Sequence, residues 1–385
     1  MEQNSRLHRV PELVKTAQLL LQHRFMLEKH PYADDFQHIQ GGIDWLVRAQ
    51  KSTPDHGISK GFALNRGWLP SYVETTGYII PTMFDCSLRL GLPECHERAL
   101  SMAEWELTNQ FANGAFPGCP IETGGKPLAF DTGMVIFGLI RAYEETKENK
   151  FKMAAEKAGD WLLSIQKDSG EWQAFTLNNQ ARAYHSRISW ALLKLFFVSR
   201  EDKYRKGAVK NLNWILEQQL DNGWFQNNSF YGENRAITHT IAYAARGLLE
   251  SGILLEDDDY IRAAQKAALA LCTLSRRNGS LPGSFDSDWH PTSTFVCLSG
   301  NAQVAIIWLK LYRLTQDKRF FDAAARTVGF LKTKQNLRTE HKAIHGGISS
   351  THPIFRGYLK LFYSSWAVKF FLDLLIDYNE LRLST

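Results

Sequence analysis

Four residues capable of acid–base chemistry stand at the starts of largely apolar segments. Glu74 and Asp131 each open one such segment. His185 and His239 occupy the equivalent positions of the two segments that follow. Two carboxyl groups can protonate a leaving oxygen and activate water, which cleavage of a glycosidic bond requires. A histidine can act as the base for epimerisation or β-elimination at a sugar carbon.

Several groups compete for these roles, and the sequence leaves the choice open. Our hypothesis pairs Asp131 with either Glu74 or Asp288 for hydrolysis, whereas epimerisation or elimination would use His185 or His239. The other predicted substrate contacts are polar or aromatic residues near the same segment starts: Arg187, Trp68, Trp289, Glu233, Asn301, Gln303 and His345. Arg187 would pair with a carboxylate or phosphate of an anionic substrate.

Helix capping is the structural alternative for the polar segment starts. Ser, Thr, Asp and Asn are preferred N-caps, and acids suit the positive end of a helix dipole. Capping accounts equally well for Asp131, Ser299 and Ser364. It does not account for the residue types at the remaining starts: His185, Arg187, His239 and Gln303.

The elements that position these residues repeat along the chain at intervals of about 55 residues, a spacing typical of arrays of supersecondary units. The clearest copy of the repeated turn is 166–172, QKDSGEW, and the related turns contain Gly57, Gly114, Gly223, Gly279 and Gly346. Each period contains an amphipathic helix and a helix that is apolar nearly all round. The amphipathic helices are expected near 36–50, 94–111, 150–166, 202–219, 258–275 and 319–335, and the apolar helices near 73–91, 131–146, 185–199, 238–252, 300–315 and 361–378.

An open array needs polar capping repeats, yet the last helix is as apolar as the central ones. The sequence therefore predicts a closed ring, an all-α (α/α)6 barrel formed by residues 36–385 as one domain. Residues 1–35 would add a covering helix from about Pro11, a favoured first helical residue, to about Glu28. The long loops all lead into inner-helix N-termini, so we expect a polar funnel there that holds the ligand.

Two tryptophans of the repeated turns, Trp172 and Trp224, are expected to pack between helices. Trp68 and Trp289 lie in other loop positions and are the better candidates for stacking against a sugar ring. The glycine-rich segment 343–353, which contains His345, is either a wall of the site or an ordinary turn. It lacks the lysine and the strand–loop–helix context of a P-loop.

Composition limits the partners and the location. The formal charge of +5 is spread among acids and bases, so nucleic acid is not an expected partner, and a small-molecule or oligosaccharide substrate is. No stretch approaches the about 18 apolar residues of a membrane span, and the start lacks the apolar core of a secretory signal. Five cysteines without CxxC spacing indicate a reduced, cytoplasmic protein. We expect no cofactor and no metal ion.

The alternating helices with turns such as 166–172 resemble the toroid superfamily of squalene/hopene cyclases and protein prenyltransferase β-subunits. The six-hairpin arrangement is also similar to six-hairpin glycosidases, glucuronyl hydrolases and sugar 2-epimerases. Segments 130–133 and 298–303 resemble uncharacterised proteins of this toroid type. The resemblance covers nearly the whole chain and implies the fold, with site residues at the inner-helix rim.

Motifs separate the branches of this superfamily. The run 256–259, EDDD, departs from the DxDD acid motif of class II terpene cyclases and lies in a short connection, so we interpret it as a solvated turn. A DDxxD-type magnesium motif is missing from the sequence. Asp288, His290 and Cys297 do not have the spacing of the prenyltransferase zinc ligands. The leading hypothesis is a carbohydrate-active enzyme, with a glycoside hydrolase favoured over a lyase or epimerase. The alternatives are an isoprenoid-handling toroid and a non-catalytic binding toroid.

Overall fold

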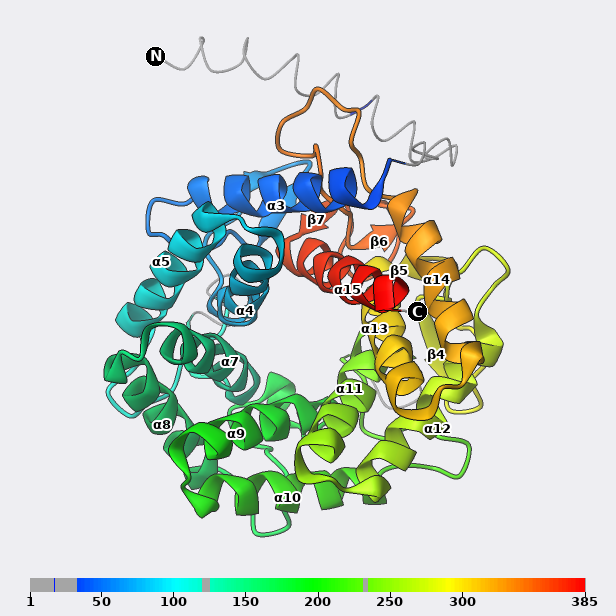
Figure 1. Ribbon diagram of the computed structural model, residues 1–385. Helices are drawn as coiled ribbons and strands as arrows, with labels where there is room; N and C mark the ends of the chain where they lie inside the picture. Colours follow the sequence, from blue (N-terminus) through cyan, green and yellow to red (C-terminus); the bar gives the residue numbers. More distant parts are fainter. Residues whose placement is uncertain (1–16, 18–32, 120–124, 231–234, 385) are drawn as a thin grey trace.

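The computed structural model describes residues 17, 33–119, 125–230 and 235–384, and in this part of the chain twelve α-helices form two concentric rings (Figure 1). The outer ring consists of α3 (Asp35–Lys51), α5 (Pro93–Asn109), α8 (Asn149–Ser164), α10 (Asp202–Glu217), α12 (Asp258–Leu274) and α14 (Lys318–Lys332). The inner ring consists of α4 (Val73–Leu90), α7 (Ala129–Thr146), α9 (Ser186–Ser199), α11 (Thr238–Leu255), α13 (Leu298–Thr315) and α15 (Ser365–Ser384).

The two rings are closed. Consecutive inner helices contact one another, and the last, α15, contacts both α13 and the first inner helix, α4. In the outer ring, Lys332 Nζ at the end of α14 lies 2.6 Å from Asp35 Oδ1 at the start of α3. The protein is therefore an (α/α)6 toroid, as the sequence predicted.

Burial explains why the two helix types alternate. In outer helix α14 the buried residues Phe320, Ala323, Ala324 and Thr327 recur with helical spacing, and the opposite face carries charges. In inner helix α11 every residue from Thr238 to Gly252 is buried. Apolar side chains on all sides of such a helix leave water only when it is surrounded, and the inner ring provides that position.

In four of the repeated turns a glutamine and a glycine fasten one outer helix to the next. Gln166 Nε2 donates to the carbonyl of Gly170 in its own turn at 2.7 Å and to the carbonyl of Gly207 on the next outer helix at 2.9 Å. Gln110 and Gln219 make the same two kinds of hydrogen bond. The repeated turn is thus the joint between neighbouring hairpins.

The last copy of this joint seals the ring. Gln335 Nε2 donates to the carbonyl of Gly346 at 2.8 Å and to that of His38, on the first outer helix, at 3.0 Å. A Cβ on Gly346 would lie 1.9 Å from the carbonyl oxygen of Gly41, so only glycine permits this approach. The sixth turn therefore makes the same contact with the first outer helix, α3, that the turns of Gln110, Gln166 and Gln219 make with the next outer helix.

Short strands in the long loops were not predicted. They are β1 (Gly61–Ala63), β2 (Gly67–Trp68), β3 (Arg235–Ile237), β4 (Ser284–Asp286), β5 (Val296–Cys297), β6 (Thr351–His352) and β7 (Phe362–Ser364). All pairs are antiparallel, in the orders β2-β1-β7, β3-β4 and β5-β6. Three of these pairs join loops of neighbouring hairpins, so they hold the rim together where the helices end.

The observed helices begin and end within a few residues of the expected positions. The covering helix expected over residues 11–28 lies outside the described residues except for position 17, and the division into 1–35 and 36–385 stays a prediction. None of the helices in the described part of the chain has the combination of length and apolar content that a bilayer span needs.

Candidate active site

A cavity of about 250 Å³ opens at the N-termini of the inner helices, and we call it the rim cavity. Four of the predicted catalytic residues line it: Glu74, Asp131, His185 and His239. Its remaining walls are mainly aromatic: Tyr72, Tyr78, Phe130, Tyr184, Phe230, Tyr243, Tyr358 and Trp366. The structure thus brings two carboxyl groups and two imidazoles together in a largely apolar enclosure.

Glu74 and Asp131 are held next to each other by the hydroxyl of Tyr72. This hydroxyl donates a short hydrogen bond to Glu74 Oε2 and also interacts by hydrogen bonding with the carboxyl of Asp131. Asp131 is only 3% exposed, and its Oδ1 has no hydrogen-bond partner within the described residues. Burial raises the pKa of Asp131 well above its ordinary value, and the nearby Glu74 charge raises it further. Burial and the neighbouring Glu74 thus both favour the protonated form of Asp131.

The polar helix starts do not act as caps. Asp131 is the third residue of α7, whose N-cap is Leu128, and no side chain caps that end. Glu74 is the second residue of α4, where Tyr72 is the N-cap in an extended conformation and likewise makes no capping bond. Ser299 lies inside α13 after Cys297. The side chains of Glu74 and Asp131 line the cavity instead of capping their helices.

Lys60 brings a positive charge to the carboxyl pair. Its ammonium lies 5.3 Å from the centre of the Tyr72 ring and 3.5 Å from the Cys119 sulfur. Lys60 is 8% exposed. Its charge lowers the pKa of Asp131, but burial and Glu74 outweigh that effect.

His239 is held in one orientation by α13. Its Nδ1 lies 3.0 Å from Ser299 Oγ and 3.0 Å from Gln303 Nε2. The same Gln303 Nε2 reaches the carbonyl oxygen of Ser299 at 3.3 Å, which only the amide nitrogen can do as a donor. His239 Nδ1 is therefore an acceptor, and the ring proton resides on Nε2. Burial, with the Arg187 charge, lowers the pKa of His239 to about 3, so the ring is neutral.

His185 is a second neutral imidazole in the cavity. It is 1% exposed, and its Nδ1 has no hydrogen-bond partner among the described residues. Burial and the charge of Arg182 lower its pKa to about 3. Its ring centre lies 5.0 Å from that of Tyr184. Unlike His239, His185 has no hydrogen-bond partner at Nδ1 in the described chain that would fix its tautomer.

Three predicted contacts have structural partners instead of a place in the cavity lining. Asn301 accepts from the Leu281 amide at 2.8 Å and donates to the Cys297 carbonyl at 2.8 Å. Gln303 lies outside the cavity lining and donates a hydrogen bond to His239 Nδ1. Arg187 is buried below the rim cavity among aromatic rings and lines a different cavity.

The loop candidates also lie away from the rim cavity lining. Trp68 packs against Trp45, with ring centres 5.2 Å apart. Trp289 packs against Trp224, and its Nε1 donates to the Asn222 carbonyl at 3.0 Å. The Nδ1 of His345 lies 3.3 Å from the Thr339 carbonyl oxygen. Glu233 lies outside the described residues.

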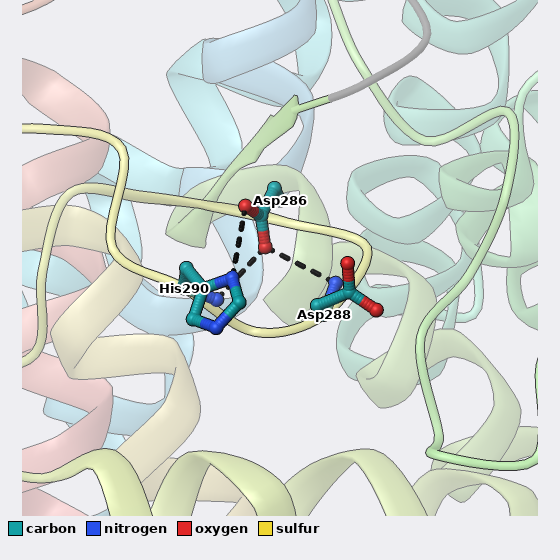
Figure 2. Close-up of side chains that lie close together, drawn as sticks. All are labelled: Asp286, Asp288 and His290. Carbon is teal, nitrogen blue, oxygen red and sulfur yellow. Dashed lines mark hydrogen bonds and ion pairs between the residues drawn. The ribbon is translucent and has the colours of Figure 1, made fainter.

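Asp288 belongs to an exposed loop cluster with Asp286 and His290, and Figure 2 shows the three side chains. Asp286 Oδ1 accepts from the backbone amides of Asp288 at 3.1 Å and His290 at 2.8 Å, and its Oδ2 lies 3.4 Å from His290 Nδ1. These bonds close the loop after β4. Cys297, considered with Asp288 and His290 as a zinc ligand, is buried elsewhere and is not part of the cluster.

Several cavity residues escaped the sequence analysis. Tyr78 and Tyr243 each follow a nominated residue by four positions, Glu74 and His239 respectively, so helical spacing alone could have identified them. Lys60 and Tyr358 come from loops and carry no such signal.

Glu106, on outer helix α5, was also missed. It is fully buried, and neither carboxyl oxygen has a hydrogen-bond partner in the described chain. Burial raises its pKa well above the ordinary value, and the Asp131 charge adds to this shift. A second buried carboxyl group with a raised pKa thus lies near Asp131 on its outer-ring side.

No protein-family model and no curated protein matches this chain. Solved structures do match. An unsaturated glucuronyl hydrolase specific for heparin has a TM-score of 0.74 at 14% identity, covering 91% of this chain and 99% of that one. A cellobiose 2-epimerase from Bacillus thermoamylovorans has a TM-score of 0.68 at 11% identity, covering 88% and 97%. A D-mannose isomerase has a TM-score of 0.71 at 12% identity, covering 91% and 100%. These similarities show the fold, an (α/α)6 toroid.

Proposed function

We propose that this protein is a carbohydrate-active enzyme that binds its substrate in the rim cavity and cleaves a glycosidic bond by acid–base catalysis. The observation that carries this proposal is the carboxyl pair in the rim cavity: Asp131 is buried with an unpartnered Oδ1 among the described residues, and Tyr72 links it to Glu74. A protonated carboxyl group next to a second one is the combination that glycoside hydrolysis requires.

In the proposed reaction Asp131 donates its proton to the leaving glycosidic oxygen. Burial and the nearby Glu74 raise its pKa, which favours the protonated form that a general acid needs. Glu74, fixed by the Tyr72 hydroxyl, activates water or attacks the sugar carbon directly. His239 presents its Nε2–H as a neutral hydrogen-bond donor to a substrate oxygen.

The cavity walls support a sugar as the ligand. Tyrosine rings offer apolar faces for the C–H side of a sugar ring, and their hydroxyls can bond to sugar hydroxyls. Tyr78, Tyr184, Tyr243 and Tyr358 all line the cavity. The substrate we propose is an oligosaccharide or glycoconjugate, and Lys60 is the cationic group that would favour an anionic one. The five cysteines are all unpaired, which supports the proposed cytoplasmic location.

The structural relatives support the sugar class but not the reaction. Their names describe a hydrolase, an epimerase and an isomerase, all acting on carbohydrates. The preference for hydrolysis therefore rests on Asp131 and Glu74 alone.

Epimerisation is the second candidate, and the fixed orientation of His239 favours it. Ser299 and Gln303 hold a neutral imidazole in the rim cavity, and it can take a proton from a substrate only in the tautomer that leaves Nε2 unprotonated. In this reaction His239, rather than Asp131, would be indispensable.

The proposal is tested by incubating the purified protein with a library of oligosaccharides and measuring new reducing ends. Wild-type protein should release them from at least one substrate, and Asp131→Asn and Glu74→Gln should each lower turnover by about 10²- to 10⁴-fold while binding is retained. Asp288→Asn is the matched control, because this aspartate is exposed and lies outside the cavity lining; its turnover should equal the wild type.

Other results would contradict the proposal. Equal losses in Asp131→Asn and Asp288→Asn would remove the carboxyl pair from the mechanism. Epimerised product that depends on His239 but not on Asp131 would establish the second candidate. Binding of a polyprenyl lipid in the cavity without any saccharide binding would establish an isoprenoid-handling protein instead.

A further inference from the structure

A second cavity, of about 260 Å³, is lined by residues of all six inner helices, and we call it the axial cavity. Tyr78 lines both cavities, and Arg187, which lines the axial cavity, lies 4.5 Å from the ring centre of Tyr243 in the rim cavity. Seven cationic and five carboxylate side chains line the axial cavity, so positive charge is in excess.

The carboxylates toward the mouth are matched by cations. Three such pairs are Asp85 with Arg141 at 2.8 Å, Glu144 with Lys194 at 3.9 Å and Asp377 with Arg89 at 3.6 Å. Arg89, Lys194 and Glu144 are more than one-third exposed, so these pairs are accessible to solvent. The excess positive charge must lie deeper.

In the buried part, two carboxylates face four cations. Asp373 accepts from Lys369. Glu250 is shared, since its Oε1 lies 3.3 Å from Arg246 Nε and 3.2 Å from Lys310 Nζ. Burial alone would raise the pKa of Glu250, but Lys310 and Arg246 outweigh it and lower the pKa, so Glu250 is ionised. The single negative charge of Glu250 therefore neutralises only one of the two positive charges of Arg246 and Lys310.

Arg187 is the fourth of these cations, and it has no carboxylate within ion-pair distance among the described residues. It is 2% exposed, its Nε donates to the Met134 sulfur at 3.4 Å, and its Nη1 has no hydrogen-bond partner in the described chain. Its other neighbours are the rings of Tyr243 and Trp190, at 4.5 and 5.5 Å from ring centre to Cζ. A buried guanidinium cannot release its proton, and aromatic faces offset only part of the unfavourable burial.

Arg246 provides a second unused donor in the same cavity. Its Nη1 also has no hydrogen-bond partner in the described chain, and its Cζ lies 5.4 Å from the centre of the same Trp190 ring. Arg246 is 7% exposed. Two buried guanidinium groups therefore contact one indole ring, and each has an N–H group that the protein does not use.

We propose that the axial cavity binds a small oxyanion between Arg187 and Arg246. The planar fork of a guanidinium matches the oxygens of an oxyanion, and the excess charge of the buried groups is positive. The acids at the mouth and the small volume favour an anion of the size of inorganic phosphate over a large polyanion. This site is separate from the proposed catalytic cavity and does not depend on the proposed reaction.

The experiment is isothermal titration calorimetry of the full-length protein with inorganic phosphate at fixed ionic strength. We expect saturable binding of one phosphate per chain. Arg246→Met should weaken the binding at least tenfold. Arg205→Met is the matched control, because Arg205 lies on outer helix α10 and pairs with Asp202 at the surface, and it should bind phosphate like the wild type.

A variant that binds phosphate more tightly than the wild type makes the test independent of folding defects, because a misfolded protein would lose affinity. Glu250→Gln removes the carboxylate that competes for Arg246, so it should bind phosphate more tightly than the wild type, at least threefold. Lys310→Met, at a partly exposed position, should weaken binding if Arg246→Met does not fold. Absence of saturable binding by the wild type, or equal affinities of the wild type, Glu250→Gln and the folded cation variants, would overturn the proposal.

Discussion

At the scale of single residues, environment decides what each ionisable group can do. Asp131 and Glu74 are both carboxylic acids at the starts of neighbouring inner helices, yet burial gives Asp131 a raised pKa and an unpartnered oxygen, whereas Glu74 has the Tyr72 hydroxyl. The Tyr72 hydroxyl bonds to both acids, so the deeper burial of Asp131 is what would make it the proton donor of the pair.

The raised pKa of Asp131 predicts a pH dependence of stability. Between the unfolded pKa of an aspartate, about 3.9, and the higher folded value, the native state binds a proton that the unfolded state has released, so stability falls as pH rises. Asp131→Asn removes this effect. Relative to the wild type, the variant should therefore gain free energy of unfolding at pH 7 compared with pH 4, measured by urea denaturation at both values. A gain that does not change with pH would contradict the assignment.

The orientation of His239 gives a second prediction. Gln303→Leu removes the amide donor to His239 Nδ1, so the imidazole should populate both neutral tautomers instead of the Nε2–H form alone. ¹⁵N chemical shifts of the ring measure this distribution. Loss of a buried hydrogen bond should also lower the free energy of unfolding by about 1–3 kcal/mol. A wild-type ring with its proton on Nδ1 would show that the assignment is wrong.

The residues found from the sequence were those whose position along a helix determines where they point. Glu74, Asp131 and His239 stand at inner-helix starts, and the closed ring brings those starts together. Trp68 and Trp289 lie in loops, whose paths depend on contacts that helical periodicity does not encode. Packing between tryptophans holds Trp68 and Trp289, and an exposed loop cluster holds Asp288, although the sequence analysis had assigned all three to the site.

At the scale of elements, the repeated glutamine–glycine turn carries the contacts between hairpins. The repeat was visible in the sequence because the same geometry recurs in each hairpin, and the helix boundaries followed from it. The rim strands were not visible. They are two or three residues long, and β1 pairs with β7, about 300 residues later in the chain, so no local pattern indicates them.

The turn glycine predicts a stability difference between two alanine substitutions. Gly170 has φ of +101°, and a Cβ there would lie 2.4 Å from the carbonyl oxygen of Lys210 on the next outer helix. Gly91, the C-cap of α4, also has positive φ, at +67°, but its Cβ would have no neighbour within 4 Å. Gly91→Ala should cost about 1–2 kcal/mol for the left-handed backbone, and Gly170→Ala should cost clearly more. Urea denaturation of both variants measures the difference, and equal losses would contradict the role of the turn as a joint.

At the scale of the whole molecule, closure means that every hairpin has a neighbour on both sides. Stability should therefore depend on contacts between neighbouring hairpins more than on the order of the hairpins in the chain. Arg382, near the end of α15, donates to Asp35 Oδ2 at 3.1 Å, so the last described turn lies beside the start of α3. Closure could be predicted from the sequence because the last helix is as apolar as the central ones, whereas the end of an open array would be polar.

A circular permutant tests this view. Joining Thr385 to Met1 and opening the chain between Arg200 and Glu201, both exposed, should give a folded protein with a similar circular dichroism spectrum and cooperative melting. Opening it between Met134 and Val135 of the buried helix α7 is the control and should abolish cooperative melting. A permutant opened at the exposed site that fails to fold would show that the linear order of hairpins is essential.

The seal between Gln335 and His38 has a consequence during synthesis. Translation at about 5–20 residues per second separates the emergence of these two positions by tens of seconds. Throughout that interval the first hairpin, α3 and α4, exposes the apolar surface that packs against the last hairpin in the closed ring. The last hairpin, α14 and α15, has not yet been synthesised. Nascent chains of this protein should therefore recruit chaperones to their earliest segment, and a premature stop codon just before α15 should send the entire polypeptide to degradation or aggregation.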